Sequence, residues 1–529
     1  MGIAGGSEDN LVSRLVAEDK TPWYKKHNLT LLYLLMFPTC IGIEMTSGFD
    51  SSMMNGLQAV ATWQEFFGHP RKTILGLLSA LYSLGSMAAL PLVPITADKL
   101  GRRWAIIIGT LFMILGAGLQ TGSKNFAMFV IARFFLGFGI PFCIVAASSM
   151  IGELSYPKER ARLGSLFNAS WFIGAIVAAG VTLGTFSMPN DWAWRIPSVL
   201  QICPSLLQIA FIWFLPESPR WLVAHGRNEE AFALLVKYHA EGDVNSEIVK
   251  AEYAEIEKTL ELERETNKQG WSALFSTPGM RKRVFVASFL GLATQWSGNG
   301  LTSYFLSPIL DNVGITDNRQ KNLINLSMTC WGFINASIFA LTMPRLKRRP
   351  VYLTCTISLT LVFTGWTIAS ARYAINKDLN ASRAVIAFIF LYSPFYNMAY
   401  NALTYTYLVE IFPYSARAKG VSIFQWFGRC AGFFNQFVNP IGIGNAGWKY
   451  YISYVVFLLF EVVFVFFMFP ETSGKSLEEL AFLFEGDIRA EQEKRVEEQV
   501  NDAHIPVSPV SELAKDKEAG HVQHLDNKP

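Results

Sequence analysis

The stretch GELSYPKERARLGS at Gly152–Ser165 decides the fold, because it recurs as VEIFPYSARAKGVS at Val409–Ser422. In each copy a glutamate precedes an arginine by seven positions, and each copy separates two long apolar runs. A second repeated pattern, FLPESPRWL at Phe214–Leu222 and MFPETSGKSLEEL at Met468–Leu480, closes each apolar half. Such duplication, with charged segments between apolar ones, predicts a membrane protein built from two related halves.

The composition places most of the chain inside a lipid bilayer. Of its 529 residues, 51% are hydrophobic and 16% are charged, whereas soluble proteins carry about 25% charged residues. Apolar windows of about 20 residues, the length of a spanning helix, fill the chain between three charged segments. The net charge of +3 is too small to predict a nucleic-acid partner. The first 28 residues are polar and lack the apolar core of a signal peptide, so we expect the first span to direct insertion.

We therefore predict an all-α membrane protein with twelve transmembrane helices in two six-helix bundles. The spans expected in the first half are 29–55, 74–97, 103–122, 126–151, 164–187 and 195–215. Those expected in the second half are 284–313, 323–343, 351–372, 384–409, 418–440 and 449–469. The domains that follow are an N-terminal segment (1–28), a first bundle (29–215), a linker (216–283), a second bundle (284–469) and a tail (470–529) that we expect to be largely disordered after about residue 485.

Basic residues in short loops predict the orientation of the spans. The loops after spans 2, 4, 8 and 10 carry most of them, namely Lys99, Arg102, Arg103, Lys158, Arg160, Arg162, Arg345, Lys347, Arg348, Arg349, Arg417 and Lys419. The loops on the other side are less basic, although Arg71 and Lys72 lie in one of them. Both termini and the linker are therefore expected in the cytoplasm.

The linker has a helical pattern of its own. Val249, Tyr253, Ile256 and Leu260 recur at helical spacing among good helix formers. We expect short amphipathic helices that lie under the bundles, with a solvated linker helix as the alternative.

No residue pattern predicts an enzyme, a metal or a cofactor. The six cysteines lie in or beside apolar runs and are interpreted as small apolar side chains. The sequence contains no zinc-ligand spacing, no phosphate-binding glycine loop and no nucleophile–base arrangement. None of the seven histidines lies in an expected span, so a histidine relay for protons is not available.

Five short motifs carry a resemblance to a known family. They are DKLGRR at 98–103, PESPRWL at 216–222, PETSGKSLEEL at 470–480 and the two Glu/Arg segments. Together they resemble the sugar porter family of the major facilitator superfamily over residues 29–484. TPWYKK, SSMMNGLQ and QWSGNG are similar to the fungal lactose-permease, cellodextrin and hexose transporters. The resemblance implies a monomeric carrier of the fungal plasma membrane, with two bundles around a central sugar site that opens alternately to each side.

The resemblance also implies a clasp of charges at the cytoplasmic ends. Asp98, Arg102 and Arg103 are expected to meet Glu153 and Arg160 in the first bundle, Glu410 and Arg417 are expected to meet in the second, and Glu217 and Glu471 should join them. These ion pairs would hold the outward-facing state and break when the carrier opens inward. The second copy of the loop, PRLKRRP at 344–350, lacks the acidic residue and the glycine of the motif, so we expect a weaker clasp there. Simple interfacial anchoring is the alternative.

Two charges inside expected spans predict proton coupling. A charge at bilayer depth costs several kcal/mol and usually has a function. Asp50 and Arg133 match the positions at which proton-coupled members of the family carry an aspartate–arginine pair. A conformational change that alters this pairing would let a proton bind on one side and leave on the other; a static structural pair is the alternative. Glu44 is left unassigned, and Arg429 and Glu461 are expected to be structural.

Polar residues within spans are the candidates for a sugar site, since such sites are apolar pockets with a few placed polar groups. The resemblance points to Asn168, Gln295, Asn299, Tyr304, Asn401, Tyr405 and Asn435. Groups smaller than usual at positions 168, 300 and 405 predict a roomier site, as a disaccharide would need, although hexose carriers share this pattern. The alternative for each residue is a hydrogen bond between helices. Asn380, in an outer loop, fits a glycosylation acceptor.

These observations predict a secondary transporter that carries a hexose or disaccharide together with protons. The partners are then a small sugar, protons and the lipid bilayer. The alternatives are a facilitative uniporter, a carrier of a polyol or secondary metabolite, and a non-transporting sugar sensor, although sensors have longer tails.

Overall fold

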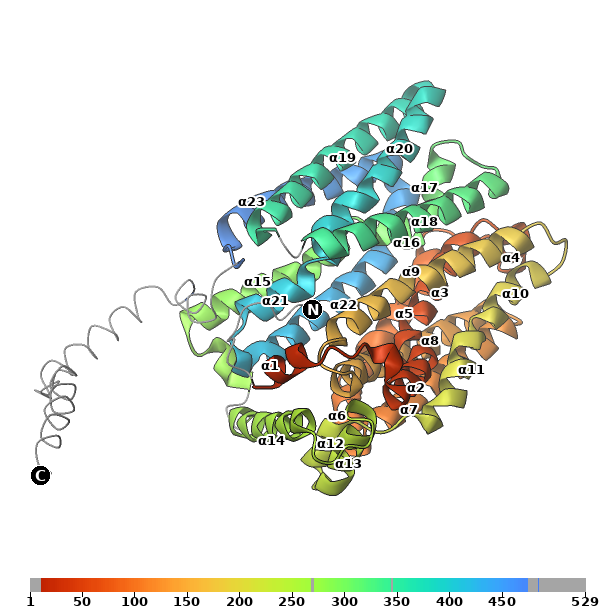
Figure 1. Cartoon of the computed structure of the whole chain (residues 1–529). Helices are drawn as coiled ribbons and strands as arrows, with labels where there is room; N and C mark the ends of the chain where they lie inside the picture. The colour runs from red at the N-terminus through yellow and green to blue at the C-terminus, as the bar shows by residue number, and fades with distance from the viewer. Residues whose placement is uncertain (1–10, 268–270, 344–345, 474–483, 485–529) are drawn as a thin grey trace, which may run out of the picture.

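The computed structural model describes residues 11–267, 271–343, 346–473 and 484, and it consists of two helical halves that lie side by side (Figure 1). The first ten residues and the tail expected to be disordered lie outside the described residues, as does most of the PETSGKSLEEL motif. Figure 1 shows the red-to-yellow half and the green-to-blue half as separate groups of helices. The halves are described in turn.

The first bundle contains six spans, three of them made of more than one helical piece. Span 1 consists of α2 (His27–Met36), η2 (Phe37–Ile41) and α3 (Ile43–Leu57), and span 2 consists of α5 (Thr73–Ala89) and α6 (Leu92–Leu100). Spans 3, 4 and 5 are the single helices α7 (Arg102–Thr121), α8 (Phe126–Leu154) and α9 (Arg160–Thr185). Span 6 consists of α10 (Trp192–Leu200), α11 (Ile202–Phe211) and η3 (Ile212–Phe214). A short helix, α4 (Ala61–Phe66), connects spans 1 and 2.

The second bundle repeats this plan. Span 7 consists of α15 (Pro278–Trp296), α16 (Asn299–Tyr304) and α17 (Leu306–Asn312). Spans 8 and 9 are α18 (Asn318–Thr342) and α19 (Arg348–Asn376), and span 10 consists of α20 (Leu379–Tyr396), η6 (Asn397–Asn401) and α21 (Thr404–Ile411). Span 11 is α22 (Tyr414–Ala446), and span 12 is α23 (Tyr450–Met468), which follows the short turn η7 (Gly447–Lys449).

Length and hydropathy support the twelve-span architecture. Eight helical stretches are long and apolar enough to cross a membrane, and α5 with α6 forms a further span bent by 48°. The longest stretch, Lys419–Met468, contains two spans, α22 and α23. Spans 7 and 10 complete the twelve, but each is divided into shorter pieces. The prediction of an all-α membrane protein with twelve spans in two bundles is therefore confirmed.

The breaks in the spans were not predicted, and local chemistry explains them. Pro38 lies in the wide turn η2, and Pro394 lies just before the similar turn η6. A proline removes one backbone donor and clashes with the preceding turn, so the helix widens or bends there. In span 7 the break falls at Gly298, whose φ of +103° is open to glycine but strained for other residues.

The linker folds into helices that pack on the first bundle, as the apolar spacing predicted. They are α12 (Pro219–Ala224), α13 (Asn228–His239) and α14 (Glu247–Asn267), and Figure 1 shows them grouped beside α1 (Leu11–Glu18). Val249 is fully buried against Leu235 and Val236, and Tyr253 and Ile256 pack against the same cluster. The apolar stripe of α14 thus faces α13 rather than solvent.

The two bundles touch most closely at the ends of the spans that lie away from the charged loops. Asn55 of α3 donates from Nδ2 to the Ser303 carbonyl (2.8 Å) and accepts from the Leu306 N–H (3.1 Å). Gln58 donates to the Tyr304 carbonyl at 2.7 Å. A Cβ on Gly56 would lie 2.6 Å from Thr182 Cγ2 of α9 and 3.2 Å from Asn322 Oδ1 of α18, so glycine permits the close approach of α3 to both neighbours. The bundles are therefore joined at one end.

Candidate functional site

Asp50 of α3 and Arg133 of α8 form an ion pair in the interior of the first bundle. Their side chains are 1% and 0% exposed, and Arg133 Nη1 pairs with Asp50 Oδ1. Gln201, at the junction of α10 and α11, donates from Nε2 to the same oxygen at 2.9 Å. The Arg133 guanidinium also lies over the Tyr82 ring, 4.9 Å from its centroid. Three spans and an aromatic face therefore position this pair.

The pair is incompletely hydrogen-bonded. Within the described part of the chain, Asp50 Oδ2 and the Arg133 atoms Nε and Nη2 have no hydrogen-bond partner. A buried ion pair stabilises a protein only when its remaining donors and acceptors are satisfied. This arrangement is therefore suited to rearrangement rather than to maximal stability.

The same pair is linked to the second bundle through Tyr304. Its side chain hydrogen-bonds with Ser51, the residue after Asp50, and it interacts electrostatically with Asp50 and Arg133. The Ser51 hydroxyl lies 3.3 Å from the Ser303 carbonyl, to which it donates. A change in the charge of Asp50 can consequently affect span 7 of the second bundle through Ser51 and Tyr304.

Sequence reasoning missed a second charged group between the bundles. Arg429 of α22 interacts electrostatically with Glu44 of α3 and with Tyr405 of α21, and also with Tyr304. Glu44 and Arg429 were recognised as charges in spans, but sequence spacing could not place them opposite each other. The structure brings them within electrostatic reach of each other across the two bundles, although the ion pairs of the described residues include none between Glu44 and Arg429.

Three of the predicted sugar residues gather at the break in span 7. Gln295, the last residue but one of α15, is half-buried, and Asn299 begins α16 and accepts from the Ser303 hydroxyl at 3.1 Å. Asn435 of α22 is buried, donates to the Gln295 carbonyl at 2.7 Å and accepts from Tyr454 at 3.1 Å. The Asn435 amide is thus engaged in holding the break, while the Gln295 side chain remains available.

The other candidates lie on α9, η6 and α21. Asn168 and Asn401 are exposed, and Asn401 donates to Asn397 Oδ1 at 3.0 Å. Tyr405 is 39% exposed and hydrogen-bonds with Gln425. Gly300 faces Asn435, and a Cβ there would lie 3.1 Å from Asn435 Nδ2. The roomier site expected from positions 168, 300 and 405 stays a prediction.

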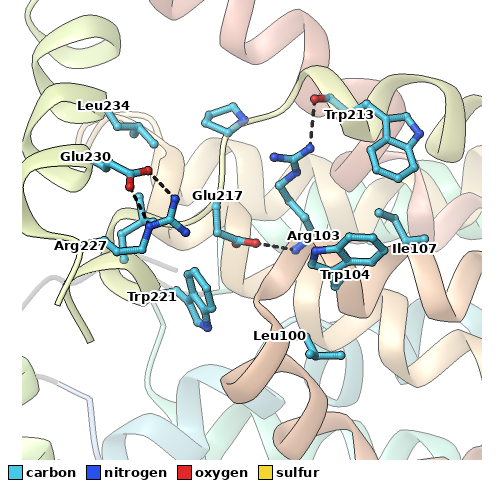
Figure 2. A pocket seen from close by; sticks show the side chains of 12 residues that line it. Leu100, Arg103, Trp104, Ile107, Trp213, Glu217, Trp221, Arg227, Glu230 and Leu234 are labelled. Atoms are coloured by element: carbon cyan, nitrogen blue, oxygen red, sulfur yellow. Dashed lines mark hydrogen bonds and ion pairs between the residues drawn. The ribbon is translucent and has the colours of Figure 1, made fainter. Parts of the chain in front are cut away.

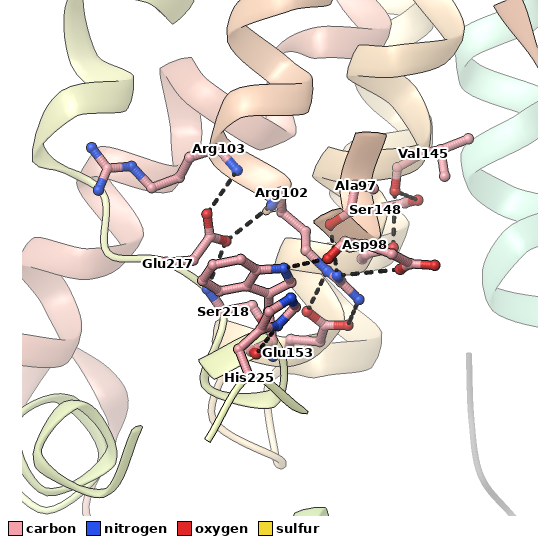
Figure 3. A network of polar contacts seen from close by, with 12 residues as sticks. Ala97, Asp98, Arg102, Arg103, Val145, Ser148, Glu153, Glu217, Ser218 and His225 are labelled. Atoms are coloured by element: carbon pink, nitrogen blue, oxygen red, sulfur yellow. Dashed lines mark hydrogen bonds and ion pairs between the residues drawn. The ribbon is translucent and has the colours of Figure 1, made fainter. Parts of the chain in front are cut away.

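The charged end of the first bundle is a connected network (Figure 3). Arg102 pairs with Glu153 (Nε–Oε2 3.3 Å), and with Asp98 at 3.6 Å, where Asp98 is largely exposed. Glu217 accepts from the backbone N–H groups of Arg102 (3.1 Å) and Arg103 (3.2 Å), the first residues of α7. A carboxylate at a helix N-terminus satisfies donors that the helix cannot. Burial raises the pKa of Glu217, although these N–H groups favour its ionised form.

The second bundle repeats this network. Arg348 pairs with Glu410 (Nη2–Oε1 2.8 Å), and Glu471 accepts from the backbone N–H groups of Arg348 (2.9 Å) and Arg349 (3.2 Å). Thr472 also donates to Glu410 at 2.5 Å. The Arg348–Glu410 contact is shorter than the Arg102–Glu153 contact, so the missing acidic residue and glycine do not abolish this pair. The weaker clasp expected here stays a prediction. Arg417 is half-buried near the start of α22.

Arg160 does not join Glu153 as expected. It pairs instead with Glu252 of the linker helix α14 at 2.5 Å, and the other Glu252 oxygen lies 2.6 Å from His239 Nδ1. His239 Nε2 faces the Leu154 carbonyl at 3.1 Å. Burial alone would raise the pKa of Glu252, but His239 and Arg160 together hold it below its usual value. This buried group ties the linker to the end of α8, a contact that no sequence signal could indicate.

A cavity of about 460 Å³ lies at the charged ends of spans 3 and 6, between the start of α7 and the linker (Figure 2). Figure 2 shows Arg103, Trp104 and Trp213 on one side of it and the exposed pair Arg227–Glu230 on the other. It is lined by none of the predicted sugar residues.

Asn380, the predicted glycosylation acceptor, is exposed in the first turn of α20, whereas the Ser382 hydroxyl of its triplet is buried and donates to the Val313 carbonyl at 2.7 Å.

Comparisons with known proteins agree with this architecture. The model of the family "Sugar (and other) transporter" matches residues 35–484. A high-affinity glucose transporter of Kluyveromyces lactis is 28% identical, over 96% of this chain and 94% of its own. The MFS-type transporter criB of Aspergillus cristatus is 26% identical, over 86% and 96%. The inward-open structure of the xylose transporter XylE from E. coli shares the fold with a TM-score of 0.70, at 20% identity, covering 86% of this chain and 100% of that chain. This chain belongs to the sugar porters of the major facilitator superfamily, a family of membrane transporters and not of enzymes.

Proposed function

We propose that this protein carries a hexose or a disaccharide together with protons across the fungal plasma membrane. The observation that carries the proposal is the buried, incompletely hydrogen-bonded pair Asp50–Arg133, which contacts the second bundle through Tyr304. The name of the Kluyveromyces lactis relative, a glucose transporter, supports a sugar as the substrate. A xylose symporter with the same fold is described as proton-coupled, which supports the use of protons.

In the proposed mechanism, Asp50 takes up the proton. Protonation removes the charge that holds Arg133, and the guanidinium, which has two unused donors, then turns toward other acceptors. Gln201 and Tyr304 sense this change, because both contact the pair or its neighbours. Coupling follows if sugar binding and proton binding favour the same arrangement of the bundles.

The sugar would bind between the bundles. Gln295, Asn299, Asn401, Tyr405 and Asn168 offer amide and hydroxyl groups that are exposed or half-buried. Tyr304 would connect the sugar to the proton site. Asn435 would hold Gln295 in place and would not contact the sugar directly.

We infer that the charged ends face the cytoplasm and that the structure is the inward-facing state. The contacts of Asn55 and Gln58 join the bundles at the opposite end. The ion pairs Arg102–Glu153 and Arg348–Glu410 each lie within one bundle. In the outward-facing state we expect these clasp residues, with Asp98, Arg103, Arg160, Glu217, Arg417 and Glu471, to bring the two charged ends together.

The test is uptake of radiolabelled glucose, xylose, lactose and cellobiose by yeast that lacks its own hexose carriers, with and without a protonophore. Accumulation that the protonophore abolishes supports symport and names the sugar. Asp50→Asn should then lose uphill accumulation but keep exchange of labelled for unlabelled sugar, since exchange needs no net proton movement. Concentrative uptake by Asp50→Asn would contradict the proposed role of the pair.

Other outcomes identify the alternatives. Equilibration that ignores the protonophore would make the protein a facilitative uniporter. Absence of uptake of all four sugars, with the protein at the cell surface, would favour a polyol, a secondary metabolite or a sensor.

A further inference from the structure

We propose that Glu461 of α23 is an uncharged hydrogen-bond donor that holds the break of span 7 and thereby positions Gln295 and Asn299 for the substrate. The inference rests on the proposed function as a sugar carrier. It assigns a task to a carboxyl group in the middle of the last span, where a charge would be costly.

Glu461 is surrounded by neutral groups. Its side chain is 0% exposed. Ser297 Oγ lies 2.9 Å from Oε1 and 3.1 Å from Oε2, and the Tyr400 hydroxyl lies 3.0 Å from Oε2. The ion pairs of the described residues include none with Glu461, although they include Asp50 and Glu410. A carboxylate buried without a cation is so unfavourable that the group takes up a proton instead.

The count of donors and acceptors leads to the same protonation state. Ser297 Oγ carries one hydrogen and lies 2.5 Å from the Ala293 carbonyl, which can only accept. Ser297 must therefore donate to Ala293, and its contact with Glu461 needs a hydrogen from the carboxyl group. Tyr400 donates to the other carboxyl oxygen. Protonated Glu461 satisfies all three contacts, whereas beside an ionised carboxylate Ser297 Oγ would face Glu461 Oε1 at 2.9 Å with no hydrogen between the two oxygens.

These contacts lie where span 7 is interrupted. α15 ends at Trp296, and the last carbonyls of a helix lack partners within it. Tyr396 donates to the Thr294 carbonyl at 2.7 Å, and Asn435 donates to the Gln295 carbonyl at 2.7 Å. Ser297, held by Glu461, caps the Ala293 carbonyl. Spans 10, 11 and 12 thus each supply a side chain that stabilises the break.

The break determines where the sugar candidates lie. Gln295 precedes Ser297 by two residues, and Asn299 follows it by two, across the left-handed Gly298. A shift of Ser297 would therefore move both amides. The equivalent spans of the first bundle, 1, 4 and 6, meet at Asp50, Arg133 and Gln201. We infer a division of tasks, in which the first cluster holds the titrating carboxyl and the second holds a carboxyl that keeps its proton.

The experiment compares Glu461→Gln with Glu461→Leu, and uses Phe460→Leu, on the exposed face of α23, as a matched control. The amide of Gln can donate to Ser297 and accept from Tyr400, so Glu461→Gln should keep the wild-type KM and the wild-type dependence of accumulation on pH. Glu461→Leu should raise the KM for sugar about tenfold, with less effect on the maximal rate. A wild-type KM in Glu461→Leu, or loss of accumulation in Glu461→Gln, would overturn the proposal.

A second measurement does not depend on transport. The infrared spectrum of the purified wild type minus that of Glu461→Gln should show the carbonyl stretch of a protonated carboxylic acid. A carboxylate band in its place would contradict the neutral state. If the wild type carried no sugar, the proposed function would fail, but this spectrum would still decide the state of Glu461.

Discussion

At the scale of single residues, Asp50 depends on Gln201 as well as on Arg133. Gln201 was not a candidate from the sequence, because a glutamine in an apolar span shows neither its depth nor its direction. Its Nε2 donates to the oxygen that Arg133 also contacts. A donor to a carboxylate stabilises and orients it, so Gln201 helps to position the carboxyl group that we propose for proton coupling.

Gln201→Leu should therefore shift proton coupling without abolishing it. Loss of the donor leaves the Asp50 carboxylate less firmly held, so the dependence of accumulation on external pH should differ from that of the wild type. Initial rates of sugar uptake measured across a series of external pH values test this. Gln208→Leu is the control, because Gln208 is equally buried on α11 but accepts from Thr110. An identical shift in both variants would attribute the effect to general loosening of span 6.

At the scale of elements, the break of span 7 depends on one glycine. Gly298 has a φ of +103°, and a Cβ there would lie 2.3 Å from Phe363 Cζ. Gly298→Ala combines backbone strain with a clash and should destabilise the protein by about 1–3 kcal/mol. Gly184→Ala is the control, since a Cβ on this residue of α9 meets no atom within 4 Å. Thermal unfolding in detergent should show a lower midpoint for the first variant only; equal midpoints would contradict the assigned role.

The linker element gives a prediction about pH. The pKa of Glu252 is lowered in the folded protein, so its ion pairs stabilise the linker above the unfolded pKa, about 4.3, and this stabilisation is lost as the pH falls through the folded pKa. Glu252→Gln should remove about 3 kcal/mol from the docking of α14 at neutral pH, because Arg160 and His239 lose their partner.

Hydrogen exchange of α14 measures this effect. Faster exchange is expected in Glu252→Gln at neutral pH, and the difference from the wild type should disappear in acid. Glu257→Gln, an exposed neighbour on the same helix, should exchange like the wild type. If both variants exchanged at the wild-type rate, the buried group would not be what holds the linker.

The elements also show what the sequence could predict. Hydropathy and the duplicated segments define twelve spans, because both are properties of the chain itself. The breaks at η6 and Gly298 have the local causes Pro394 and the glycine itself, which hydropathy does not register, whereas the contact of Arg160 with Glu252 results from packing between distant segments. Among the site candidates, Asp50 and Arg133 lie together, whereas Asn435 is engaged with the backbone. Pairwise contacts of this kind leave no trace in one sequence.

At the scale of the whole molecule, the two bundles are joined by helix packing, as between α5 and α22, and by side chains that bind the backbone of the other half. Asn55 makes hydrogen bonds to residues 302, 303 and 306. Removal of these bonds weakens one closed end and leaves each bundle intact. The balance between the two states should move accordingly.

Asn55→Ala should therefore populate the opposite conformation. Loss of hydrogen bonds worth about 1–3 kcal/mol changes the ratio of the states by about 5- to 150-fold. Spin labels on α4 and α17 would report a longer distance across this end. Gln64→Ala, which removes a hydrogen bond within the first bundle, is the control. An unchanged distance distribution in Asn55→Ala would show that other contacts hold the bundles together.

Glu217 and Glu471 bind the starts of α7 and α19 by accepting hydrogen bonds from main-chain N–H groups, not from side chains. Every residue except proline supplies such a group. The loop that reads DKLGRR in one half can therefore read PRLKRRP in the other half and keep the contact between the carboxylate and the helix start. Where a contact recognises the backbone, the side chains around it are free to change. The two equivalent loops of a duplicated transporter can therefore diverge in sequence and still make the same contact.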